Sequence, residues 1–181
     1  INARAAVYAA REVRKKNGRE VPLMLSITVA DTGGRTLSGQ TLDAFLASVQ
    51  HAPIFSIGLN CSFGAKQLKP FLQQLAKRAP YYISAYPNAG LPNSLGEYDQ
   101  TPEDMANEVK EYIEEGLVNI IGGCCGTTEA YIAEFVPMVE GVKPHVPASK
   151  ANYFCLSGLE LLEQSEEVKF INVGERCNVA G

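Results

Sequence analysis

The sequence has few of the features on which several large protein classes depend. No apolar run approaches the roughly 20 residues needed to span a bilayer, so a membrane-spanning protein is not expected. No basic cluster exceeds Arg14–Lys16 and the net charge is −4, so the sequence does not predict binding to nucleic acid or to an anionic membrane. With only His51 and His145 present, histidine-based catalytic triads have little to draw on.

Cysteine is also scarce, with five residues in 181. The odd count and the adjacent pair Cys124–Cys125 argue against a scaffold of simple disulfide pairs. We therefore expect a reducing, cytoplasmic context. Residues 1–4 resemble no signal peptide and do not begin with Met, so we expect the sequence to be part of a longer protein.

Hydrophobic patterning predicts a chain in which strands and helices alternate. The apolar, partly β-branched runs predict four strands, at Leu23–Val29, Ile54–Leu59, Tyr81–Tyr86 and Val118–Ile121. Helical periodicity and capping residues predict helices at Asn2–Asn17, Thr41–Gln50, Ala65–Arg78, Pro102–Glu115 and after Thr128. Strands that are each followed by a helix imply parallel pairing with right-handed crossovers.

This pattern predicts an α/β fold of a particular size. The strands are apolar on both faces, as in a sheet covered by helices or closed into a barrel. A complete (β/α)8 barrel needs about 200 residues, so residues 1–141 supply about half of one. Beyond Gly141 the Pro-rich run 142–148 predicts a linker, which we assign to 142–167. Val168–Gly174 predicts the first strand of a second domain, truncated at 168–181.

The unusual residues follow the carboxyl ends of the predicted strands, which form the active face of parallel α/β folds. Cys61 follows the second strand, and Cys124 and Cys125 follow the fourth within a glycine-rich stretch. Glycines tolerate positive φ, so a sharp turn there could aim both neighbouring thiols at one metal ion. Three thiolates with no fourth cysteine or histidine nearby in the sequence predict an open zinc site of the kind that performs chemistry.

These motifs resemble those of the cobalamin-dependent methionine synthase family over essentially the whole chain. Gly58–Cys61 and Gly122–Thr127 are similar to its two zinc-ligand motifs, and Pro87–Asp99 is similar to the loop between them. Asp31–Gly39 resembles the loop after an earlier strand, and Asn172–Asn178 resembles the opening of its folate-binding barrel. The resemblance implies that residues 1–141 are the C-terminal half of a homocysteine-binding barrel of TIM type.

The resemblance also implies a reaction, in which the thiol of homocysteine is methylated to give methionine. Zn²⁺ on Cys61, Cys124 and Cys125 would activate that thiol. The methyl group would come from methylcobalamin and ultimately from 5-methyltetrahydrofolate. Both cofactors would lie on parts of the full-length enzyme outside this chain, so the implied partners are homocysteine, the missing barrel half, and the folate and cobalamin domains.

Five further residues are implied as substrate contacts. Asn88 could occupy the fourth metal position when substrate is absent, while Asp31 and Glu97 could hold the homocysteine ammonium group. Ser38 and Thr127 could hydrogen-bond its carboxylate. Each residue also has a plain structural alternative: Asn88 can shape a turn, the two acids can bond backbone N–H groups, and the two hydroxyls can cap helices.

Two other functions compete with this interpretation. The cysteine motifs are also found in stand-alone homocysteine methyltransferases that use betaine or S-methylmethionine. The segment Gly174–Arg176 favours the cobalamin-dependent type, and a requirement for cobalamin would separate the two. A non-catalytic zinc-binding module is the third possibility, and its closed metal site would not respond to homocysteine.

Overall fold

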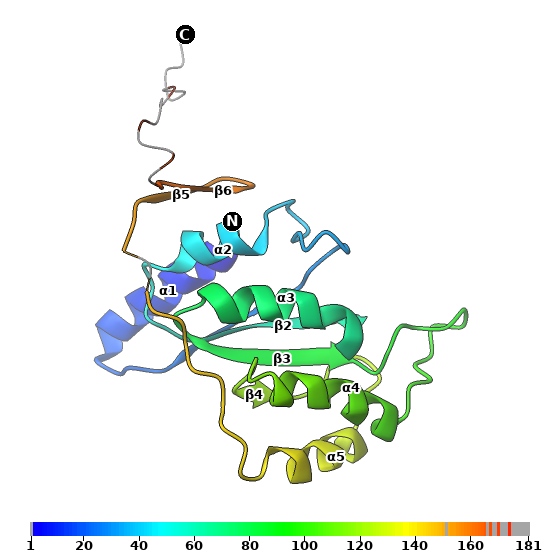
Figure 1. The fold of residues 1–181 in the computed structure, drawn as a ribbon. Helices are drawn as coiled ribbons and strands as arrows, with labels where there is room; N and C mark the ends of the chain where they lie inside the picture. Colours follow the sequence, from blue (N-terminus) through cyan, green and yellow to red (C-terminus); the bar gives the residue numbers. More distant parts are fainter. Residues whose placement is uncertain (1, 151, 166, 168–169, 171–173, 175–181) are drawn as a thin grey trace.

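The computed structural model describes residues 2–150, 152–165, 167, 170 and 174. Its elements are α1 Asn2–Asn17, β1 Leu23–Ile27, α2 Leu42–Val49, β2 Ile54–Gly64, α3 Ala65–Arg78, β3 Tyr82–Asn88, α4 Pro102–Glu114, β4 Ile120–Ile121, α5 Glu129–Val139, β5 Cys155–Ser157 and β6 Leu161–Glu163 (Figure 1). None of the described helices is long and apolar enough to cross a membrane. The strand predicted at Val168–Gly174 lies largely outside the described residues.

The first four strands form one parallel sheet in the order β1-β2-β3-β4. Leu25, Ile57 and Ile83 stand in register on one face, where Ile57 and Ile83 are fully buried. Helix α3 packs against both β2 and β3, so this face belongs to the core. The predicted α/β fold with parallel strands is therefore confirmed.

Two helix starts that looked alike in the sequence differ in the structure. Thr101 caps α4, because its side-chain oxygen accepts a hydrogen bond from the backbone N–H of Asp104 at 3.2 Å. Thr128 occupies the same position before α5, but its side chain makes no capping bond. Of these two threonines, only Thr101 therefore caps its helix with a side-chain hydrogen bond.

The apolar stripes of the first and last helices are only partly covered. In α1, Val7 is buried whereas Val13, on the same apolar stripe, is exposed. In α5, Phe135 is buried but Ile132 and Val136 are exposed. These two side chains line an apolar groove of about 520 Å³ beside β4, a strand that pairs on one side only within the described residues.

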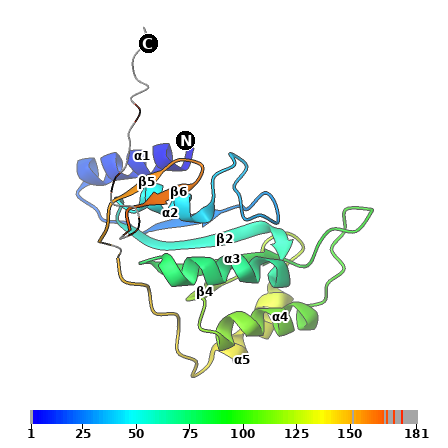
Figure 2. The same cartoon turned by 45° about the horizontal axis from the view of Figure 1, so that its top comes forward.

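The segment after α5 returns along the sheet and ends in a hairpin. Backbone N–H groups of His145 and Ala148 donate to the carbonyls of Val118 and Ala79, which ties the otherwise irregular residues 142–150 to the domain. Strands β5 and β6 then pair antiparallel and lie against α2 (Figure 2). The predicted linker thus contains regular structure of its own, and the domain boundaries at 141 and 167 stay a prediction.

The two caps offer a matched test of helix stabilisation. Thr101→Ala removes an occupied capping bond and should lower the free energy of unfolding by about 1 kcal/mol. Thr128→Ala removes none and should change it by less than about 0.5 kcal/mol. Urea denaturation followed by circular dichroism measures both, and equal losses in the two variants would contradict this account of the caps.

Candidate metal centre

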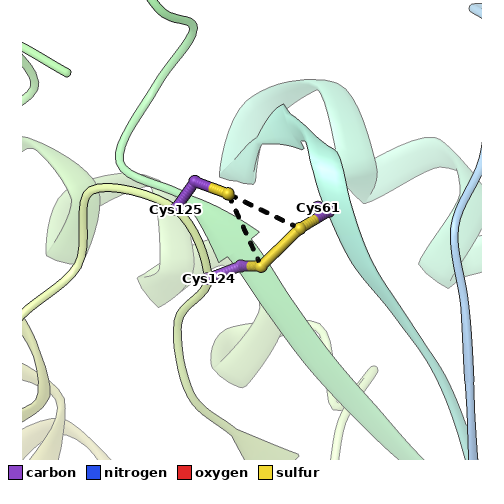
Figure 3. A group of neighbouring side chains, drawn as sticks. All are labelled: Cys61, Cys124 and Cys125. Carbon is purple, nitrogen blue, oxygen red and sulfur yellow. Dashed lines mark hydrogen bonds between the residues drawn. A yellow bond between two sulfur atoms is a disulfide. The ribbon is translucent and has the colours of Figure 1, made fainter. Parts of the chain in front are cut away.

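Three cysteine sulfur atoms converge at the carboxyl ends of the parallel strands. Cys61 comes from β2, and Cys124 and Cys125 come from the turn that follows β4 (Figure 3). The Sγ atom of Cys125 lies 3.7 Å from that of Cys61 and 3.9 Å from that of Cys124. Thiolates bound tetrahedrally to zinc at about 2.3 Å stand about 3.8 Å apart, so both separations fit one zinc ion.

Cys61 and Cys124 are joined as a disulfide in the structure, although the cysteine count predicted no simple pairing. The reason is proximity, because thiols that converge to share a metal ion are also close enough to bond when oxidised. Cys125 remains a free, exposed thiol. Both paired sulfur atoms must be reduced before they can act as metal ligands together with Cys125.

The backbone bends sharply at Cys61. Strand β2 runs past its predicted end at Leu59 as far as Gly64, and its register with β3 shifts between Asn60 and Gly64. Within this shift Cys61 and Ser62 have φ of 58° and 62°, the left-handed region that costs non-glycine residues about 1–2 kcal/mol each. Such outliers gather where a side chain must be aimed for binding, and here the bend carries a sulfur of the cluster.

The turn that carries the other two cysteines is bonded to the end of β3. The Cys124 N–H donates to the carbonyl of Pro87 at 2.8 Å, and the N–H of Ala89 donates to the carbonyl of Cys125 at 2.9 Å. The buried Asn88 accepts from the Cys125 N–H through its Oδ1 at 3.2 Å. The cysteine pair is therefore held in place by the backbone of the neighbouring strand.

Two of the expected substrate residues bond directly to this turn. The amide oxygen of Asn88 already accepts the Cys125 N–H, although a carbonyl oxygen has a second lone pair that could reach a metal. The hydroxyl of Thr127 donates to the carbonyl of Cys124 at 2.6 Å, which closes the turn. Thr127 thus shapes the cysteine turn, whereas helix capping was its expected structural alternative.

Two others form bonds within the loop that joins β1 to α2. One carboxylate oxygen of Asp31 accepts from the N–H groups of Gly33 at 2.9 Å and Arg35 at 3.2 Å. The hydroxyl of Ser38 lies 3.1 Å from that of Thr36. Asp31 therefore bonds nearby backbone N–H groups, as its structural alternative predicted. Its other carboxylate oxygen and the exposed hydroxyl of Ser38 are the groups left for a ligand.

Glu97 lies on the exposed loop between β3 and α4, where its N–H donates to Asn93 Oδ1 at 3.0 Å. Its neighbour Tyr98 was not among the predicted residues, yet it reaches the cysteines. The side chain of Tyr98 packs on Gly126, and a hydrogen bond with Cys125 raises the pKa of the Tyr98 hydroxyl. In the sequence, only its position next to Glu97, in the loop that resembles the family's, pointed to a role for Tyr98.

Gly126 provides a test of the turn geometry. It has φ of 79°, and an added Cβ would lie 2.5 Å from the Cβ of Tyr98, so Gly126→Ala should displace the turn. We expect zinc affinity to fall about ten-fold or more, equivalent to about 1.4 kcal/mol, in competition with a chromophoric chelator under reducing conditions. Gly96→Ala is the control, since Gly96 has φ of 82° but open space around it. Equal affinities of the two variants would refute this account.

Comparison with known proteins agrees with this geometry. A family model described as homocysteine S-methyltransferase matches residues 1–139, from the first residue to the end of α5. The match includes the whole parallel sheet and all three cysteines of the cluster. Members of this family transfer a methyl group to the thiol of homocysteine, and their chemistry generally depends on zinc, which the cysteine cluster could bind. This chain therefore belongs to the homocysteine S-methyltransferase family.

Proposed function

We propose that residues 1–141 are the zinc-bearing C-terminal half of the homocysteine-binding (β/α)8 barrel of a cobalamin-dependent methionine synthase, followed by an interdomain linker at 142–167 and the start of the pterin-binding domain at 168–181. The convergence of the three sulfur atoms is the observation that carries the proposal. The Pro-rich segment and the Asn172–Asn178 motif that follow the barrel residues favour this member of the family. The methyl group would reach homocysteine from methylcobalamin, and ultimately from 5-methyltetrahydrofolate, on other domains.

The cysteines have distinct places in this function. As thiolates, Cys61, Cys124 and Cys125 would hold Zn²⁺ and leave a net charge of −1, which preserves electron density on an incoming sulfur. When bound, Zn²⁺ supplies the positive charge that keeps the homocysteine thiol deprotonated near neutral pH. Cys125 is exposed while the other two are partly buried, so a substrate would approach from the side of Cys125.

The remaining contacts are assigned by position. Asn88 accepts a hydrogen bond from the backbone N–H of Cys125 and is proposed as the weak fourth ligand in the absence of substrate. Thr127 and Ser38 are proposed to hold the homocysteine carboxylate, for which the Thr127 hydroxyl would turn its proton from the carbonyl of Cys124 to the substrate. Asp31 and Glu97 are proposed to hold its ammonium group. For Asp31 the oxygen that accepts no backbone bond would do this, so the loop need not unfold.

The open sheet edges support the assignment to half of a barrel. Among the described residues β1 pairs only with β2, and β4 only with β3. Closure of an eight-stranded barrel would require four further strands, which we assign to the missing barrel half of the parent enzyme. We also propose a cytoplasmic location, because a site built from thiolates needs a reducing compartment.

The family match fits a stand-alone homocysteine methyltransferase that uses betaine or S-methylmethionine equally well. A parent enzyme that methylates homocysteine without cobalamin would establish that alternative. A non-catalytic zinc module is distinguished by its response to substrate, because a closed site has no position to give to homocysteine.

Cobalt substitution tests the metal site and its open position together. The reduced chain loaded with Co²⁺ should show intense thiolate-to-cobalt absorption that changes when homocysteine is added. Cys124→Ala should lose stoichiometric metal, whereas Cys155→Ala should retain it, because Cys155 lies in β5 outside the cluster. Full metal content in Cys124→Ala would contradict the assignment of Cys124 as a metal ligand. A spectrum unchanged by homocysteine would indicate a closed site.

The isolated chain should not complete the reaction. Within the described residues β1 and β4 each pair on one side only, so the site lacks the other barrel half, which we expect to position zinc-bound homocysteine for methyl transfer. We expect no methionine above background when the reduced, zinc-loaded chain is incubated with homocysteine and methylcobalamin, followed by mass spectrometry. Turnover by the isolated chain would contradict the assignment to half of a barrel.

A further inference from the structure

The β5–β6 hairpin contacts the loop that joins β1 to α2, residues 28–41. The backbone N–H of Thr41 donates to the carbonyl of Leu159 at 2.9 Å. The side-chain amide of Gln40 donates to the carbonyl of Gly158 at 2.9 Å and to the hydroxyl of Ser157 at 3.1 Å. The turn of the hairpin therefore satisfies donors at the end of the loop.

Arg35 extends this contact into the middle of the loop. Its guanidinium group donates to the carbonyl of Gly39 at 2.8 Å and forms an ion pair with Glu160 of the hairpin. Its backbone N–H donates to the carboxylate of Asp31. Through Arg35 the hairpin thus reaches the segment that holds Asp31, one of the proposed ammonium ligands.

The hairpin also contacts the neighbouring helices α2 and α3, and Ser157 takes part in both sets of contacts. The Ser157 hydroxyl donates to the carbonyl of Ala44 in α2 at 2.6 Å. At the far end Arg78 of α3 pairs with Glu163, which also accepts a hydrogen bond from Tyr153 at 2.8 Å. Because Glu163 touches no residue of the loop in these contacts, the two ends of the hairpin can be tested independently.

The contacts at the loop differ in strength. The side chains of Arg35 and Glu160 are 39% and 64% exposed, so their ion pair alone contributes little. Gln40 and Ser157 are partly buried, and hydrogen bonds between less exposed groups lose more when one partner is removed. Ser157 is thus the stronger point of attachment and Glu160 the weaker one.

We propose that the β5–β6 hairpin positions the β1–α2 loop for substrate, with Arg35, Gln40, Ser157 and Glu160 as positioning residues. The proposal rests on the proposed function, since it makes homocysteine affinity depend on contacts outside the metal centre. The hairpin lies on the segment that leads to residues 168–181, which we assign to the pterin-binding domain.

Hydrogen exchange tests the structural half of the proposal without any substrate. In the double variant S157A/E160A, amides of residues 30–40 should exchange about ten-fold faster, as expected when bonds worth about 1.4 kcal/mol in total are lost. Glu160→Ala alone should give a smaller increase, about two-fold. Glu163→Ala, the matched control, should leave these amides unchanged, and all variants should keep full zinc content. Unchanged exchange in the double variant would overturn the proposal.

Homocysteine titration of the Co²⁺-loaded chain tests the functional half. The apparent Kd of S157A/E160A should rise about five- to ten-fold, as the loop loses its bonds, while Glu163→Ala should match the unmodified chain. Faster exchange with an unchanged Kd would overturn the positioning role. A lack of response by the unmodified chain would instead refute the proposed function, and the exchange experiment would still decide whether the hairpin holds the loop.

Discussion

The candidate site depends on the meeting of Cys61 with the Cys124–Cys125 pair. Cys61 and Cys124 are 63 positions apart in the sequence, and the parallel pairing of β2, β3 and β4 brings their strand ends to one edge. The left-handed bend at Cys61 and the bonded turn after β4 then aim the sulfur atoms at a common point. Without the turn after β4, the neighbouring side chains of Cys124 and Cys125 would point to opposite faces of the sheet.

The surroundings of the cluster hold it in one geometry. Strained φ values at Cys61 and Ser62 persist because strand pairing on either side fixes the backbone. Hydrogen bonds to the end of β3 and to the Thr127 hydroxyl hold the cysteine turn in place. A site pre-arranged in this way loses little entropy when a ligand binds, and the same closeness of sulfur atoms accounts for the disulfide found between two of them.

Much of the fold follows from the sequence, and the exceptions have physical reasons. Periodicity and caps predict the order of β1 to α5, and the cysteine positions predict their common edge. The continuation of β2 to Gly64 has no such signal, since non-glycine residues in the left-handed region are set by tertiary context. Strands β5 and β6 are short and acquire their structure from α2, so residues 155–163 look like linker alone. Tyr98 acts through a contact that no spacing rule predicts.

X-ray absorption at the zinc edge tests the central claim most directly. The reduced, zinc-loaded chain should show three sulfur neighbours at about 2.3 Å and one oxygen or nitrogen neighbour. Addition of homocysteine should convert this shell to four sulfur neighbours. A shell of fewer than three sulfur atoms before homocysteine is added, or one that stays unchanged afterwards, would contradict an open three-cysteine centre.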